Sequence, residues 1–173
     1  MLNILRRTSP EARLARSLYE SITSASRQPE FFRELAVEDT VDGRFDVLAL
    51  HAWLAFGRLN EEGMGAMARK LSDTIFTGFD EALRDLGNGD MGMGPRMKKL
   101  GLAFNGRMHA YEAAKTEAEM AEAILRNVYR GKTGMARQAN ILAKYAFSAR
   151  EHLKLSNAAG GTLDFGALNP TSA

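Results

Sequence analysis

The sequence predicts an all-α protein with one compact domain of six or seven helices. Three observations support this fold class. Apolar side chains recur every three or four residues through most of the chain, which is typical of helices that pack on a core. Helix-starting residues precede several of these stretches, and no stretch has the alternating pattern of a convincing strand. At 173 residues the chain fits a single domain and can bury roughly 70% of its unfolded surface.

The first predicted helix begins after Ser9. This serine can cap the helix, Pro10 suits its first turn, and Glu11 meets the positive end of the helix dipole. One apolar stripe then runs to about residue 25 through Leu14, Leu18, Tyr19 and Ile22. Because residues 1–28 are amphipathic and rich in arginine, we expect this N-terminal helix to be able to contact a membrane surface.

The pattern in the middle of the chain predicts a buried central helix, which lies between the N-terminal amphipathic helix and a further helix. A short segment with packing residues opens at Pro29. Residues 42–59 predict the central helix, because apolar residues surround it on all sides from Phe45 to Phe56, which marks a buried helix. The stretch is too short to cross a bilayer. A further helix is expected over residues 65–86, with Gly87 placed to end it in a left-handed cap.

Three more helices are expected after this glycine. Pro95 suits the first turn of a helix that carries Met97, Leu100, Phe104, Met108 and Tyr111 on one face. Helices are also predicted over residues 117–129 and 135–155. Residues 157–173 have no period, so we expect a flexible tail. The predicted organisation is thus an N-terminal amphipathic helix (1–28), a helical domain (29–156) and a tail (157–173).

The composition excludes several classes of function. The chain has no cysteine, so disulfides, thiol-ligated metals and thiol catalysis are excluded. The net charge of +2 is weaker than nonspecific DNA binding usually requires, although the sequence pI is about 9.0. Because no secretory signal or membrane-spanning stretch is found, we expect a cytoplasmic protein that can be peripheral at the inner membrane.

Charge is distributed unevenly along the chain. Residues 37–95 carry 11 acidic and 5 basic side chains, a net charge of −6. Residues 96–111 carry Arg96, Lys98, Lys99 and Arg107 and no acidic residue, a net charge of +4. This pattern predicts either a polarised binding surface for RNA, anionic lipid or an acidic protein, or two solvated helix faces of opposite sign.

A glycine-rich stretch precedes the basic residues. Gly87, Gly89 and Gly92 match the G-x-G-x-x-G dinucleotide fingerprint, but that fingerprint requires a preceding strand, and the residues before Gly87 are helical by period. A nucleotide site is therefore not expected. We expect instead a loop in which the side chains of Met91 and Met93 are exposed and adaptable to an apolar partner, next to Asp90. A merely flexible connector is the alternative.

The polar residues predict no credible catalytic or metal site. Two aspartate-rich helices can hold magnesium diphosphate in all-α prenyl synthases, and Asp42, Asp46 and Asp80 leave open an isoprenoid-diphosphate or lipid-binding protein or enzyme. The cluster around Asp80 lacks the repeated spacing of those enzymes, however, and Asp39 and Asp42 fit helix-start roles better. His109 and Glu112 form one H-x-x-E pair without partner glutamates, so a structural histidine is expected. We therefore expect a protein that is not an enzyme and has no cofactor.

Three stretches carry a resemblance to a known family: "DTVDGRFDVLALHAWLAFGRL", "DEALRDLGNGDMGMGPRMKKLGLAFNGRMHAYEAA" and "ILRNVYRG". They resemble the ubiquinol–cytochrome c chaperone family, assembly factors of the cytochrome bc1 complex, over roughly residues 30–145. By position, the matching residues in the first stretch are Asp42, Arg44, Phe45 and Asp46. Those in the second are Gly87, Gly89, Asp90, Arg96, Lys98, Lys99, Phe104, Gly106 and Arg107. The methionines of the loop and Asn105 depart from the family pattern.

The resemblance implies an α-helical chaperone without enzymatic activity. Its expected client is newly made cytochrome b or another bc1 subunit. Further expected contacts are the ribosome or an anionic membrane surface, and a small partner subunit, but not DNA. The residues expected to contact a client or partner are Asp42, Arg44, Asp46, Asp90, Met91, Met93, Arg96, Lys98, Lys99 and Arg107.

Overall fold

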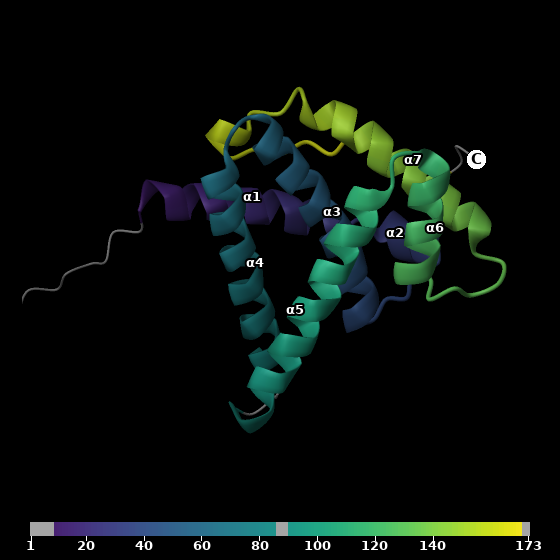
Figure 1. Ribbon diagram of the computed structural model, residues 1–173, viewed down its shortest axis with the longest axis horizontal. Coiled ribbons are helices and arrows are strands. Elements are labelled where there is room, and N and C mark those ends of the chain that lie inside the picture. Colours follow the sequence, from purple (N-terminus) through teal and green to yellow (C-terminus); the bar gives the residue numbers. More distant parts are fainter. Residues whose placement is uncertain (1–8, 86–89, 171–173) are drawn as a thin grey trace, which may run out of the picture.

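A computed structural model describes residues 9–85 and 90–170 of the chain (Figure 1). These residues form seven α-helices and one short 3-10 helix, and they contain no strand. The α-helices are α1 (Pro10–Ser26), α2 (Pro29–Arg33), α3 (Val41–Glu61), α4 (Gly65–Asp85), α5 (Asp90–Ala113), α6 (Glu117–Asn127) and α7 (Ala136–Leu153). The 3-10 helix η1 spans Ala158–Gly160. The predicted all-α fold class is therefore confirmed.

Helix α3 lies at the centre of the domain, as predicted for residues 42–59. The Thr40 hydroxyl accepts a hydrogen bond from the Gly43 N–H at 3.1 Å and so caps the helix. Buried side chains follow on every side of α3, including Leu50, Ala52 and Leu54. Helices α1, α4, α5 and α7 all pack against α3, because only a surrounding layer of helices can cover a helix that is apolar all round.

The N-terminal helix belongs to this layer. The Ser9 hydroxyl accepts a hydrogen bond from the Ala12 N–H at 3.1 Å, which confirms the predicted cap. Ala15, Leu18 and Ile22 are fully buried, and α1 packs against α3 and α4. The apolar stripe is thus covered by the domain itself, and contact of the N-terminal segment with a membrane surface stays a prediction. No helix in the described part of the chain combines the length and apolar character needed to cross a membrane.

Helices α4 and α5 form a V-shaped arm that projects from the other helices (Figure 1). The sequence predicted that α5 would begin near Pro95, but the helix begins at Asp90. Pro95 lies in the second turn, where its missing N–H costs one intrahelical hydrogen bond. The side chain of Met93 is only 6% exposed, so packing stabilises the added turn. The predicted cap at Gly87 lies outside the described residues.

The segment after α7 is irregular, as predicted, but residues 157–170 are packed on the domain rather than forming a flexible tail. Leu163, Phe165 and Leu168 are buried, and the Phe165 ring centroid lies 4.9 Å from that of His51. The Ser17 hydroxyl donates a hydrogen bond to the Gly161 carbonyl at 3.0 Å. The spacing of these apolar residues matches no regular period, and for that reason their burial was not predicted.

Candidate functional site

The basic residues predicted to bind a partner lie on the outer face of α5. Arg96, Lys98 and Lys99 are exposed, and no ion pair holds them within the described residues. One turn further along, the side chain of Leu102 is 67% exposed. Gly106 follows after another turn and is also exposed. The outer face of α5 therefore combines positive charge with uncovered apolar surface.

The structure describes only part of the glycine-rich stretch, and that part differs from the predicted loop. From Asp90 onward the described backbone is helical, and Met93 is buried instead of offered to a partner. A methionine side chain is flexible enough to fill irregular gaps, which suits this buried position. Gly87 and Gly89 lie outside the described residues, as do the side chains of Asp90 and Met91.

Two other predicted contact residues form a buried ion-pair network. The side chain of Asp46 on α3 has no exposed surface. Its Oδ1 accepts from Arg107 Nη2 at 2.5 Å and from Arg107 Nε at 2.6 Å, and its Oδ2 accepts from Arg130 Nη1 at 2.7 Å. The Arg107 guanidinium also lies over the Phe45 ring, 4.8 Å from its centroid. Asp46 and Arg107 therefore join α3 to α5 inside the domain, and their contact with a partner stays a prediction.

Burial and the neighbouring positive charges shift the pKa of the Asp46 carboxylate in opposite directions. Burial raises the pKa of Asp46 above its usual range, while the Arg107 and Arg130 guanidinium groups oppose that shift. Arg130 reaches Asp46 from the loop between α6 and α7, where its backbone has a φ of 53°. It also donates to the carbonyl groups of Asn127 and Val128 at 3.0 and 2.8 Å. The network thus joins three distant parts of the chain.

The remaining aspartates do not form a diphosphate site. Asp42 is exposed in the first turn of α3, Asp46 is enclosed by two arginines, and Asp80 pairs with Arg84 at 2.9 Å. Within residues 9–85 and 90–170, no group of three or more His, Cys, Asp or Glu side chains could hold a metal ion. The alternative of an isoprenoid-diphosphate site built from Asp42, Asp46 and Asp80 is therefore wrong. Arg44, close to Asp42, pairs with Asp39 at 2.6 Å.

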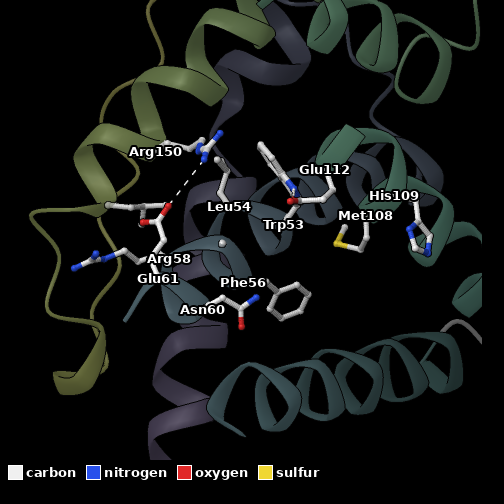
Figure 2. A pocket seen from close by; sticks show the side chains of 12 residues that line it. Trp53, Leu54, Phe56, Arg58, Asn60, Glu61, Met108, His109, Glu112 and Arg150 are labelled. Carbon is white, nitrogen blue, oxygen red and sulfur yellow. Dashed lines mark hydrogen bonds and ion pairs between the residues drawn. The ribbon is translucent and has the colours of Figure 1, made fainter. Parts of the chain in front are cut away.

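A groove of about 490 Å³ lies between α3, α5 and α7 (Figure 2). Its apolar lining includes Trp53, Phe56 and Met108, and charged side chains stand around these residues. Trp53 Nε1 donates to Glu112 Oε2 at 3.1 Å, so Glu112 is engaged with an indole rather than with His109. The groove begins where the outer face of α5 ends, since Met108 and His109 lie two and three residues after Gly106.

The rim of the groove is formed by residues far apart in the sequence. Figure 2 shows Arg150 of α7 reaching toward Glu61 of α3, with 3.9 Å between their charged atoms. The Arg150 guanidinium also lies 5.7 Å from the Trp53 ring centroid. Sequence reasoning missed the whole groove, because each lining residue continues a helix pattern that looks like ordinary core or surface. The exposure of Leu102 was not predicted for the same reason.

The comparisons with known proteins agree with the resemblance in the sequence. The family model for the ubiquinol–cytochrome c chaperone matches residues 33–160. A solved structure of the Cbp3 homolog from Brucella abortus is 33% identical to this chain, covers 96% of both chains and superposes with a TM-score of 0.78. No curated protein sequence matches the chain significantly. The chain therefore belongs to the ubiquinol–cytochrome c chaperone family, whose role is in the assembly of the cytochrome bc1 complex.

Proposed function

We propose that this protein holds newly made cytochrome b until it enters the bc1 complex, and that it does so without chemistry of its own. The observation that carries the proposal is the family match over residues 33–160, which includes most of the folded domain. The likeness to the Cbp3 homolog over 96% of both chains supports it further. A membrane protein that is not yet assembled exposes apolar segments, so its chaperone needs a surface that shields them.

The outer face of α5 is the surface that we propose for the client. Leu102 offers apolar contact, and exposed Gly106 allows a client segment to approach the helix backbone closely. Lys98 and Lys99 stand one turn before Leu102 and can engage lipid phosphates or acidic residues beside the client segment. Basic residues near an anionic membrane contribute about 1 kcal/mol each, which permits reversible docking.

Other predicted contact residues fit this surface less closely. Arg96 lies on the same helix and is included in the proposal, and Asp90 and Met91 precede it on α5. Asp42 and Arg44 are exposed at the start of α3 and are proposed as a second contact. The groove at the far end of α5 provides apolar side chains, including Trp53 and Met108, for the continuation of the client segment.

A deletion strain complemented with variants tests the proposal. We expect deletion of the gene to remove the bc1 complex selectively from haem-stained blue-native gels, and the wild type to restore it. Lys98→Glu/Lys99→Glu should fail to restore it although the purified variant folds. The matched control is Arg69→Glu/Lys70→Glu, which reverses an exposed basic pair on α4 and should restore the complex.

Two results would contradict the proposal at different levels. An intact bc1 complex in the deletion strain would contradict the assembly role itself. Equal complementation by both reversal variants would leave the assembly role standing and contradict the assignment of the client surface to α5. Crosslinking from position 102 to cytochrome b should support both, because Leu102 lies at the centre of the proposed surface.

A further inference from the structure

A second hollow, away from α5, is lined by three arginines. It occupies about 370 Å³ where the end of α1, α2 and the start of α3 meet. Its lining residues are Arg27, Pro29, Phe32, Arg33, Asp39 and Arg44. With three cations and one carboxylate, the lining has a formal charge of +2. The client surface proposed on α5 does not include this hollow, and Arg44 is the one lining residue that also belongs to the second contact proposed at the start of α3.

The three arginines are held differently. Arg44 Nε is 2.6 Å from Asp39 Oδ1, and its guanidinium lies over the Phe32 ring at 5.9 Å from the centroid. The carboxylate of Asp39 is therefore already neutralised, and Arg44 has a defined orientation. Arg27 and Arg33 are exposed and have no ion-pair partner in the part of the chain that the structure describes. The hollow thus contains two unpaired positive charges beside one that is already positioned.

This arrangement favours one kind of ligand. A guanidinium presents a planar fork of N–H donors that matches the oxygens of a phosphate group, and several forks around one hollow can bind several of those oxygens. Phe32 and Pro29 form an apolar wall, which lowers the local dielectric and strengthens the attraction. We propose that the hollow formed by Arg27, Arg33 and Arg44 binds a phosphate group carried by a lipid headgroup or by a soluble phosphate compound.

Binding of purified protein to phosphate-bearing probes tests this inference without any client. One arm measures sedimentation with vesicles of phosphatidylglycerol in phosphatidylcholine, and with vesicles of phosphatidylcholine alone. The other arm measures calorimetric binding of inorganic phosphate and pyrophosphate. The test variant is Arg27→Gln/Arg33→Gln, which leaves the pair of Arg44 and Asp39 intact. The control is Arg69→Gln/Arg137→Gln, which removes two exposed arginines elsewhere.

We expect the test variant to weaken binding roughly tenfold or more, and the control variant to bind as the wild type does. Binding to the anionic vesicles alone identifies the lipid headgroup as the source, and binding to the soluble probes as well identifies a soluble phosphate compound. If the wild type binds neither probe, or if both variants lose affinity equally, the inference is overturned. Because no client is present, this outcome is independent of bc1 assembly.

Discussion

Arg107 on α5 and Asp46 on α3 form an ion pair in which Nη2 and Oδ1 are 2.5 Å apart and the carboxylate has no exposed surface. The Arg107 side chain is itself only 14% exposed. This contact ties the projecting arm to the central helix. It also explains how the outer face of α5 stays in a fixed orientation while its own side chains remain in solvent.

The ion pair should be important for stability. We expect Arg107→Gln to lower the free energy of unfolding by about 3 kcal/mol, because Asp46 would remain buried with only Arg130 as counter-charge. Urea unfolding followed by circular dichroism measures the change. As a control, Arg126→Gln removes a pair with Glu122 in which both side chains are mostly exposed (65% and 73%) and should cost less than about 1 kcal/mol. Equal costs for the two variants would contradict the role assigned to the network.

Two glycine positions should respond in opposite ways to alanine. A Cβ atom at Gly43 would lie 1.9 Å from the Glu38 carbonyl oxygen, so the backbone must move, and we expect Gly43→Ala to destabilise the fold by about 2 kcal/mol or more. At Gly106 a Cβ would meet nothing within 4 Å. Gly106→Ala should therefore stabilise the free protein by up to about 1 kcal/mol.

The Gly106→Ala variant also probes the client surface. If a client segment packs closely on α5, Gly106→Ala should weaken client crosslinking even though it raises the melting temperature. Crosslinking yield and thermal unfolding are measured on the same preparations. An increase in stability with unchanged crosslinking would argue against close approach at residue 106.

Burial of His51 should make stability depend on pH. Its Nδ1–H donates to the Val47 carbonyl, its Nε2 accepts from the Tyr145 hydroxyl, both at 2.8 Å, and burial lowers the pKa of His51 to about 4. The unfolded chain has the ordinary pKa of about 6.5, so it binds the proton first. The contribution of neutral His51 to the free energy of unfolding is therefore complete above pH 6.5 and is lost as the pH falls from 6.5 to 4. The total loss is at most about 3 kcal/mol.

Unfolding of wild type and His51→Asn between pH 8 and pH 4 measures this dependence. We expect the variant to be less stable at pH 8 and its stability to fall less steeply between pH 6.5 and pH 4. The difference between the two profiles removes the contribution of the carboxylates, which titrate in both proteins. Parallel profiles would contradict a buried neutral imidazole.

The segment after α7 should contribute to the core. Phe165 is 3% exposed and contacts His51, so Phe165→Ala should cost about 3 kcal/mol. Leu155, which is 87% exposed, serves as the control, and Leu155→Ala should change stability by less than about 0.5 kcal/mol. Thermal unfolding compares the two variants. A neutral Phe165→Ala would indicate that residues 157–170 add little to the fold.

Local patterns were sufficient to predict most helices. The Ser9 cap, the all-round apolar stretch of α3 and the helical period of α4 each arise from interactions within a few residues, so they can be recognised without the rest of the chain. The start of α5 was missed because Pro95 and the glycines are unfavourable locally. Burial of Met93 on the arm overrides that preference.

The sequence by itself determined the all-α class, the order of the helices and, through its motifs, the family. The tertiary structure alone decided which of the singled-out residues face outward. Asp46 and Arg107 looked like surface charges, but contacts over 61 residues pair them inside the domain. The groove and the arginine-lined hollow also exist only where separate helices meet. The physical reason is that burial and charge pairing depend on which segments come together in space, and periodicity along one segment does not contain that information.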